Sequence, residues 1–478
     1  MKGAGGPSPG SLKRLPARRR ESQPVSRNPM AQKEDLRIAI VGGGLSGLSA
    51  GHHLTKSGLK PIVFERGSFV GGRMSSERVD DFIIDKAAYT FPEFYKNLRG
   101  FVHELGIGSL LVQTPGTSSI FAAGEAHPLK VGSPSDFLRF KPLSLKSKKD
   151  VVKLFLYAQS LGSALNLGKP NRKSYELENE SAADYLLKHY DPQVLERIAY
   201  PIFCELFLGV PEKNSKLSLL ATLRTLTSFK IFAFEEGMGT LPEWLSRHVE
   251  IRLETPVLRI DPKGEKGPYE IHVGGKAPSS SVFDAVVTAV PFPLIPGMID
   301  RLPDDLIEYC RHVPYSPSIV VALGTDWRFE ERSMINNLLR TEFKTLGTVV
   351  CDRYKSRSRV PEGKGLFTAI LCEPASRYLF HEPDERITSE VLSDMDRFLP
   401  GFSEKTLFAK IYRWEQGALQ LPSGHLLKRE VVRHHLDNGV GNLYFAGESF
   451  PISSLEASFN SGVQAATQLM RNASLNGV

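Results

Sequence analysis

Three glycines and one acidic residue have the types and the spacing of a dinucleotide site. Gly42, Gly44 and Gly47 follow a short apolar run at residues 36–41 and precede a stretch with helical periodicity. Gly42 permits a tight turn, Gly44 lets a pyrophosphate approach the backbone at a helix N-terminus, and Gly47 lets helix and strand pack closely. Glu65 ends the next predicted strand, where an acid accepts hydrogen bonds from a ribose 2′-hydroxyl and disfavours a 2′-phosphate. This βαβ pattern predicts a site for NAD or FAD, and not for NADP.

A second motif follows shortly after Glu65. The run Gly71-Gly72-Arg73-Met74 resembles the GGR motif of the flavin amine oxidase, protoporphyrinogen oxidase and phytoene desaturase superfamily. The resemblance implies that the cofactor is FAD and that Arg73 lies against its pyrophosphate. The choice of FAD over NAD depends on this second motif, because the glycine turn alone fits both.

The resemblance covers nearly the whole chain, from about residue 36 to 472. Its further motifs lie at residues 237–242, 255–257, 283–291, 442–448 and 454–462. It implies that the Val257 backbone meets the adenine, that Glu448 binds a ribityl hydroxyl, and that a helix beginning near Ser454 points its N-terminus at the flavin pyrimidine. Such a helix dipole stabilises an anionic reduced flavin. Ala87 stands where the family usually has glycine, so we expect slightly different backbone packing there.

The residues expected to hold FAD come from both ends of the chain. They are Gly42, Gly44, Leu45, Ser46, Gly47, Glu65, Arg66, Gly72, Arg73, Val257, Gly447, Glu448 and Leu455. No cysteine stands near residues 414–421, which excludes a cysteinyl flavin at that point, so we expect the cofactor to be bound without a covalent bond.

Residues of the substrate pocket distinguish the branches of this superfamily. Its amine oxidases carry a lysine on the strand that matches residues 316–323, and no lysine occurs there. Their aromatic cage falls near Leu419 and Ser454, neither of which is aromatic. Trp414 and its surroundings resemble the protoporphyrinogen oxidase and desaturase branch more closely. The catalytic residues stay unassigned, with Trp414, Leu419 and Ser454 as candidates for the pocket.

The resemblance therefore implies an FAD-dependent oxidoreductase that removes a hydride from a C–H bond of a hydrophobic or cyclic substrate. Ser118 stands where an arginine that binds a tetrapyrrole carboxylate is expected. This weakens the assignment of a porphyrinogen substrate but not that of an isoprenoid or carotenoid substrate. Two alternatives stay open: an amine oxidase, and a non-catalytic protein similar to prenyl-escort and GDP-dissociation-inhibitor proteins. The intact glycine motif with both ends of an FAD site argues against the non-catalytic protein. The electron acceptor is expected to be dioxygen or a quinone.

The predicted elements indicate an α/β protein with a Rossmann-like FAD-binding domain and an inserted α+β substrate domain. The FAD-binding domain is expected at residues 36–90, 235–295 and 405–475, and the substrate domain at 91–234 and 296–404. Strands are expected at 61–65, 251–260, 269–273, 283–289, 315–324, 366–373 and 442–446, and helices through most of 90–235 and 376–400 and at 454–470.

The net charge of +7 lies in the first segment of the chain. Residues 1–33 hold eight basic side chains and one acidic one, and the rest is balanced, so the charge does not indicate nucleic-acid binding. Residues 1–35 are expected to be a disordered basic tail, and Met30 is a plausible true start. The tail has no secretory h-region, and no apolar run of 18 residues occurs.

Four scattered cysteines predict no disulfide framework and no metal site, which fits the cytoplasm. Basic and apolar residues alternate between Phe137 and Leu161. Such a pattern fits either peripheral contact with anionic lipid or a solvated face beside a buried one.

Overall fold

A five-stranded parallel sheet carries the glycine turn. Across the sheet the strands are β10 (Glu250–Arg252), β2 (Lys60–Phe64), β1 (Arg37–Val41), β14 (Ala285–Thr288) and β20 (Leu443–Phe445), and each pairs in parallel with its neighbour. The computed structural model describes residues 36–130, 133–226, 230–328, 333–447 and 454–475, besides residues 1 and 3. The expected basic tail lies outside this part of the chain.

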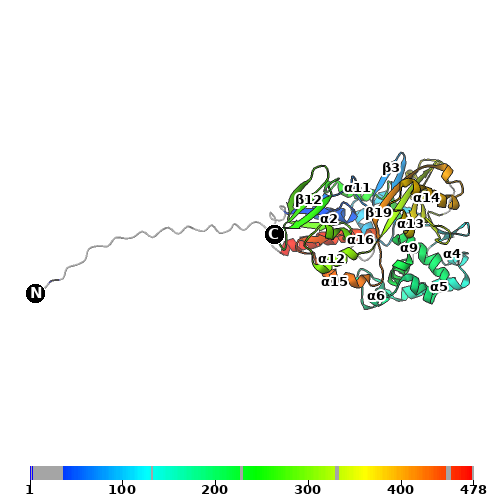
Figure 1. The fold of residues 1–478 in the computed structure, drawn as a ribbon, viewed down its shortest axis with the longest axis horizontal. Helices are drawn as coiled ribbons and strands as arrows, with labels where there is room; N and C mark the ends of the chain where they lie inside the picture. The colour runs from blue at the N-terminus through cyan, green and yellow to red at the C-terminus, as the bar shows by residue number, and fades with distance from the viewer. Residues whose placement is uncertain are drawn as a thin grey trace.

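Layers on both faces of the parallel sheet explain why its strands are continuously apolar. Ile38 and Ile40 of β1 belong to a core shared with helices α2 (Leu45–Lys56) and α16 (Leu455–Leu475). Ala39 and Val41 point the other way, into a core shared with the antiparallel sheet β11 (Val257–Pro262), β12 (Tyr269–Val273) and β13 (Ser279–Phe283). Figure 1 shows α2 and α16 side by side beneath β12. The first and last helices of the domain therefore form one layer.

A seven-stranded sheet forms the centre of the second part of the molecule. Its order is β19 (Thr406–Leu419), β15 (Tyr315–Thr325), β18 (Gly365–Leu371), β17 (Leu346–Cys351), β16 (Ile335–Leu338), β7 (Ser118–Ala122) and β8 (Glu125–Leu129). All neighbours are antiparallel except β16 and β7, which are parallel. Smaller sheets are formed by β3 (Ser76–Val79) with β4 (Phe82–Asp85), and by β5 (Phe91–Pro92), β9 (Ile231–Phe234) and β6 (Leu111–Thr114).

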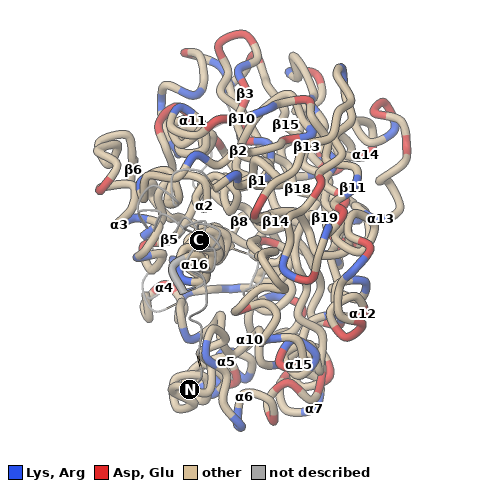
Figure 2. Tube along the Cα trace, turned by 90° about the vertical axis from the view of Figure 1, so that its left-hand side faces the viewer, with Lys and Arg blue, Asp and Glu red and all other residues tan. Residues whose placement is uncertain are grey.

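Helices surround the two sheets and fill one end of the molecule (Figure 1). The remaining α-helices are α3 (Lys96–Glu104), α4 (Pro134–Arg139), α5 (Leu145–Ser160), α6 (Arg172–Leu177), α7 (Ala182–His189), α8 (Pro192–Val194), α9 (Tyr200–Phe207), α10 (Lys216–Thr225), α11 (Thr240–Ser246), α12 (Asp304–His312), α13 (Glu373–Leu379), α14 (Asp384–Phe398) and α15 (His425–Asn438). Within the described residues, no helix is both long and apolar enough to cross a membrane. Acidic and basic residues are interspersed over the folded body in Figure 2, as expected from its balanced charge.

The structure confirms the α/β class and the two-part architecture, and it differs from the sequence-based expectation at several points. The segment expected to open the last piece of the FAD domain at residue 405 is instead β19, which pairs with β15 in the second sheet. The stretch 251–260 is two strands in two different sheets, because the chain turns at Glu254, with a φ of 51°, before Pro256. Residues 90–235 also contribute the β7–β8 hairpin, whose short strands lack a clear alternation.

Candidate functional site

The three glycines of the turn differ in what surrounds them. Gly42 has a φ of 108°, and a Cβ there would lie 2.7 Å from the carbonyl oxygen of Ala289. A Cβ on Gly47 would lie 2.0 Å from the carbonyl oxygen of Gly42, so this residue fixes the contact of α2 with β1. A Cβ on Gly44 would meet nothing within 4 Å, because Gly44 faces an open cavity. The N-terminus of α2 at Gly44 has no side-chain cap, which leaves its first N–H groups to bind an anion.

Glu65 is held in place by the backbone on both sides of it. Its Oε2 accepts the N–H of Gly43 at 2.7 Å, and its Oε1 accepts the N–H of Gly67 at 2.7 Å. Each carboxylate oxygen keeps a further lone pair for a hydroxyl donor in the cavity that Glu65 lines. The carboxylate is thus oriented before any ribose binds.

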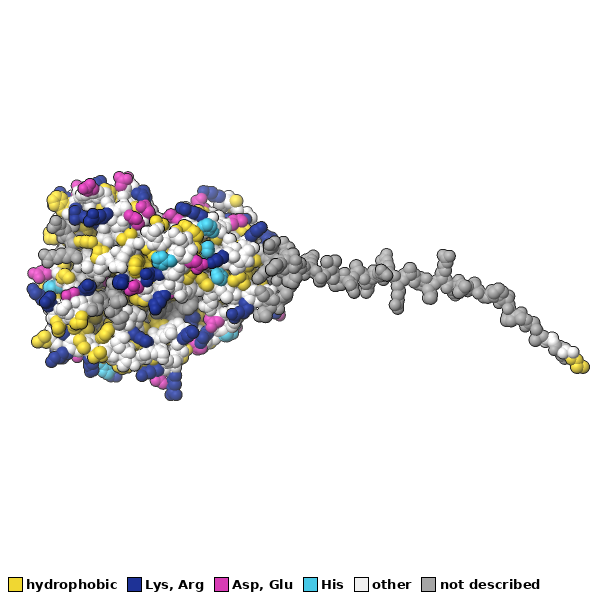
Figure 3. All heavy atoms as spheres, turned by 180° about the vertical axis from the view of Figure 1, so that it is seen from behind, with side chains coloured by type: hydrophobic (Ala, Val, Ile, Leu, Met, Phe, Trp, Pro, Cys, Tyr) yellow, Lys and Arg dark blue, Asp and Glu magenta, His cyan; other side chains and the backbone are white. Residues whose placement is uncertain are grey.

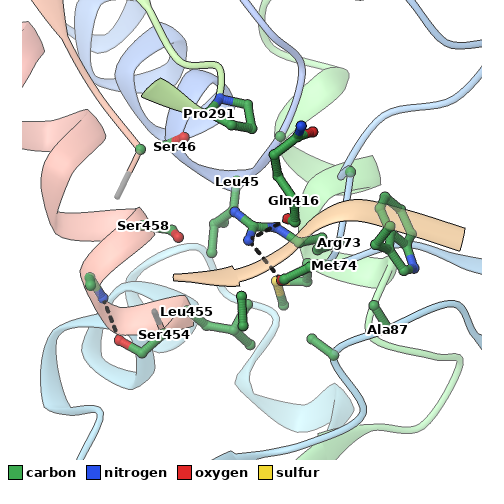
Figure 4. A pocket seen from close by; sticks show the side chains of 18 of the residues that line it. Leu45, Ser46, Arg73, Met74, Ala87, Pro291, Gln416, Ser454, Leu455 and Ser458 are labelled. Carbon is green, nitrogen blue, oxygen red and sulfur yellow. Dashed lines mark hydrogen bonds between the residues drawn. The ribbon is translucent and has the colours of Figure 1, made fainter. Parts of the chain in front are cut away.

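The GGR segment lies directly against the glycine turn. Gly71 donates its N–H to the carbonyl of Gly43 at 2.8 Å and forms an isolated bridge with Gly44. Arg73 then extends across the cavity and donates to the carbonyl oxygens of Gln416 at 3.2 Å and Gly417 at 2.9 Å (Figure 4). Arg73 therefore joins the nucleotide-binding part to β19 of the second sheet.

The C-terminal part of the site comes from β20 and α16. Gly447, with a φ of 101°, donates its N–H to the Oγ of Ser461 at 2.8 Å and lines the cavity. Ser454 and Leu455 line it as well, and the Ser454 Oγ accepts the N–H of Ala457 at 3.0 Å (Figure 4). Glu448 lies outside the described residues, so its expected contact with a ribityl hydroxyl stays a prediction.

A continuous cavity of about 1280 Å³ connects these groups to the second sheet. All the residues expected to hold FAD line it except Gly47, which is buried behind the turn, and Glu448. Of the three pocket candidates, Trp414 and Ser454 line the cavity, and the Trp414 Nε1 donates to the carbonyl of Lys86 at 3.1 Å. Leu419 does not line it: this side chain is 1% exposed and packs in the main core, because β19 has left the cavity wall there.

The far end of the cavity is mainly apolar. It is lined there by Leu206, Phe207, Val320, Ile335 and Ile370, among others. Glu205 also lines this end and is not among the residues predicted from the sequence. The sequence does carry an indication of this residue, because Glu205 is the one acidic residue in the otherwise apolar α9 sequence YPIFCELF.

Among the described residues that line the cavity, no histidine or cysteine occurs. The four cysteines are buried away from the cavity wall, and none of them forms a disulfide. Two surface groups of described residues, Asp305–His434–His435 and Asp261–Glu270–His272, bring three potential metal ligands together, and neither lines the cavity. In the second group the acids already pair with Arg259 and Lys263. Among the described residues, neither of these groups reaches the cavity, and no histidine or cysteine lines it.

A Rossmann-type glycine turn, an oriented ribose-binding acid and a cavity between two domains define a dinucleotide-dependent oxidoreductase of the two-domain flavoprotein class. The chain matches the family described as flavin containing amine oxidoreductase over residues 45–470, and it belongs to that family. It is accordingly an FAD-dependent oxidoreductase, as the sequence predicted.

Similar proteins fall on several branches of the family. The chain is 22% identical to coproporphyrinogen III oxidase of Bacillus subtilis, with 86% of this chain and 93% of that protein covered. It is 21% identical to protoporphyrinogen oxidase 2 of Arabidopsis thaliana, with 90% and 93% covered. The fold matches that of a putrescine oxidase solved with putrescine, with a TM-score of 0.74, 18% identity, and 91% of this chain and 99% of that chain covered.

Proposed function

We propose that the cavity holds FAD along its nucleotide end and a lipophilic substrate against the second sheet, and that the substrate loses a hydride from a C–H bond. The observation that carries this proposal is the continuity of the cavity from the open face of Gly44 to the apolar side chains of Val320 and Ile370. When bound, the flavin supplies the hydride acceptor.

The residues of the chain fit the parts of an FAD molecule. The free N–H groups at the start of α2, beside Gly44, bind the pyrophosphate, and Glu65 binds ribose hydroxyls. Val257, which lines the cavity, meets the adenine through its backbone in this proposal. Arg73 adds a positive charge to the cavity wall, and its hydrogen bond to Gly417 ties this part of the wall to β19. These groups bind and orient the cofactor without a covalent bond.

The substrate end favours an apolar molecule over a small polar one. Leu206, Phe207, Ile335 and Ile370 contribute hydrocarbon surface there, and burial of such surface drives binding by about 25 cal/mol per Å². No lysine is among the described residues that line the cavity, which supports the sequence-based argument against a typical amine oxidase. The names of the two porphyrinogen-oxidising relatives support a cyclic, hydrophobic substrate.

An exposed apolar surface near this end supports contact with a membrane. The α4–α5 surface consists of the exposed side chains of Leu138, Leu145, Val152, Leu156 and Tyr157. Exposed lysines lie between them, and Figure 3 shows yellow and dark-blue side chains intermixed at the lower left, where this end of the molecule lies. The segment that follows α5 contributes Leu165 and Leu167 to the cavity wall. A lipophilic substrate can therefore reach the cavity from an anionic lipid surface. None of the four cysteines forms a disulfide, which supports a reducing compartment such as the cytoplasm.

Anaerobic reduction of the bound flavin tests the proposed function. Coproporphyrinogen III and protoporphyrinogen IX, a carotenoid precursor and a set of amines would each be mixed with the oxidised holoenzyme. We expect a lipophilic substrate to bleach the flavin absorbance, and bleaching by small polar amines alone would contradict the proposal. Purified protein that shows no flavin bands and cannot be reconstituted would favour the non-catalytic alternative. Re-oxidation by dioxygen or by a quinone then identifies the acceptor.

A further inference from the structure

Glu205 is an acidic side chain at the apolar end of the cavity. It lies near the C-terminus of α9, and its neighbours Leu206 and Phe207 line the same wall. Tyr89, Ile335 and Ile370 face the cavity from other elements. Nothing in the proposed binding of FAD uses Glu205, since the expected cofactor residues come from other segments.

A chain of hydrogen bonds fixes the carboxylate. Its Oε2 accepts the side-chain N–H of Asn337 at 3.1 Å, and the same amide group donates to the Oγ of Ser118 at 3.3 Å. The Oδ1 of Asn337 accepts the hydroxyl of Thr348 at 3.1 Å, which fixes the orientation of the amide. Asn337 and Thr348 are buried on β16 and β17. The sheet therefore holds Glu205 in one position through an amide that donates to it.

Glu205 has no basic partner among the described residues, and its Oε1 has no hydrogen-bond donor among them. Of the arginines on the cavity wall, Arg73 donates to carbonyls of β19, and Arg413 donates to the carbonyls of Phe380 and Glu382. Arg66 follows Glu65 directly and lines the nucleotide end. Burial raises the pKa of Glu205 to about 7, while the hydrogen bond from Asn337 acts in the opposite direction. A carboxylate in apolar surroundings without a charged partner is costly, and a further donor in the cavity relieves that cost.

We propose that Glu205 accepts a hydrogen bond from an N–H group of the substrate and thereby selects a lipophilic substrate that carries nitrogen. This role of Glu205 rests on the proposed function and narrows the class of substrate that the enzyme accepts. A hydride lost from a carbon next to such a nitrogen leaves a C=N bond, whereas a pure hydrocarbon offers the carboxylate no donor. Glu205 thus acts as a positioning residue for the ligand.

Equilibrium binding to the oxidised holoenzyme tests this role. The probes are decylamine and decyl methyl ether, which share the apolar chain but differ in the N–H donor, and binding is followed through the flavin absorbance. We expect E205Q to weaken decylamine binding about tenfold or more and to change ether binding by less than about twofold, because the acceptor of the N–H group loses its charge. Glu205→Asp, which keeps the charge, should restore part of the decylamine affinity. Glu362→Gln, an exposed acid outside the cavity, is the matched control.

Equal changes for both probes, or unchanged decylamine binding in E205Q, would overturn the inference. Flavin content and the thermal unfolding midpoint of E205Q serve as checks on folding, and Glu205→Asp supplies the comparison if E205Q fails to fold. The proposed function is judged separately by flavin reduction in the wild-type protein. A wild-type flavin that no lipophilic compound reduces would defeat the proposed function even if E205Q showed the expected binding difference.

Discussion

Gly44 and Gly47 are three residues apart, and a methyl group on each would meet different surroundings. On Gly47 it would lie 2.0 Å from a backbone carbonyl, whereas on Gly44 it would enter the space where we place the pyrophosphate. We expect Gly47→Ala to lower the free energy of unfolding by about 1–3 kcal/mol through overpacking and also to impair FAD retention. Gly44→Ala should leave the stability of the apoprotein nearly unchanged and lose FAD selectively.

Flavin fluorescence after gel filtration measures FAD retention, and urea unfolding of both apoproteins measures stability. Gly124→Ala is not a suitable control, because its φ of 78° would strain any side chain. Gly100→Ala is better, since Gly100 lies within α3 and a methyl group there meets nothing within 4 Å. Full FAD retention by Gly44→Ala would show that the pyrophosphate does not approach this glycine.

His425 couples stability to pH. Burial lowers the pKa of His425 to about 4, and the positive charges of Arg429 and Lys428 act in the same direction. Its Nε2 is buried without a hydrogen-bond partner among the described residues. Because the unfolded chain takes up this proton near pH 6.5 and the folded one only near pH 4, the stability contributed by the neutral ring is lost as the pH falls through that window.

We expect the difference in unfolding free energy between the wild type and His425→Leu to change by about 3 kcal/mol, in favour of the variant, from pH 7.5 to pH 4. Urea unfolding at several pH values measures this difference. The variant is compared with the wild type because burial also raises the pKa of the neighbouring Glu178 to about 7. Protonation of Glu178 stabilises the folded state as the pH falls, which is opposite to the effect of His425. A difference that stays constant with pH would contradict the assignment.

At the level of elements, a buried cluster of charges joins the two parts of the molecule. Asp85 at the end of β4 pairs with Lys355 at 2.9 Å and with Arg359, and all three side chains are fully buried. Its other oxygen accepts the N–H of Met238 at 2.7 Å. Burial by itself would raise the pKa of Asp85. The charges of Arg359 and Lys355, together with the hydrogen bond from Met238, outweigh burial and lower that pKa to about 2.

Asp85→Asn removes one charge and leaves two buried cations with a single acid, Asp352, beside Lys355. We therefore expect a loss of about 3–5 kcal/mol in the free energy of unfolding, measured by urea titration of the holoenzyme. Glu104→Gln, which breaks the exposed pair with Lys56, should cost less than about 1 kcal/mol. Similar costs for the two substitutions would show that the buried cluster does not link the parts.

The sequence predicted the elements around the glycine turn well and those of the second sheet less well. The βαβ unit has local signals: an apolar strand, a glycine turn and an amphipathic helix within about 30 residues. No local sequence pattern indicates which strand β19 pairs with. It is placed by pairing with β15, about 90 residues earlier in the chain, and only that pairing draws Trp414 to the cavity and Leu419 into the core.

At the scale of the whole molecule, the α4–α5 surface predicts binding to anionic membranes. Leu145 is 78% exposed and Leu156 is 61% exposed, and both stand beside lysines of α5. We expect the protein to float with vesicles that contain phosphatidylglycerol, and the double variant Leu145→Glu/Leu156→Glu to lose this binding without losing stability. Each buried leucine contributes about 1.5–3 kcal/mol to insertion.

Leu407→Glu is a control for this experiment, since Leu407 is exposed on β19 away from this surface. Neutral phosphatidylcholine vesicles test the electrostatic part, because the lysines attract only an anionic surface. Unchanged flotation of the double variant would show that the α4–α5 surface is not the contact.

The sequence by itself determined the cofactor, since a pyrophosphate site consists of backbone groups and short spacings that a local motif encodes. Gly42, Gly44, Glu65 and Arg73 were all found in this way, and all line the cavity. The tertiary structure decided what surrounds the substrate. The role of Glu205 depends on Asn337, Ile335 and Ile370, which come from segments more than 100 residues away, and no local pattern specifies such contacts.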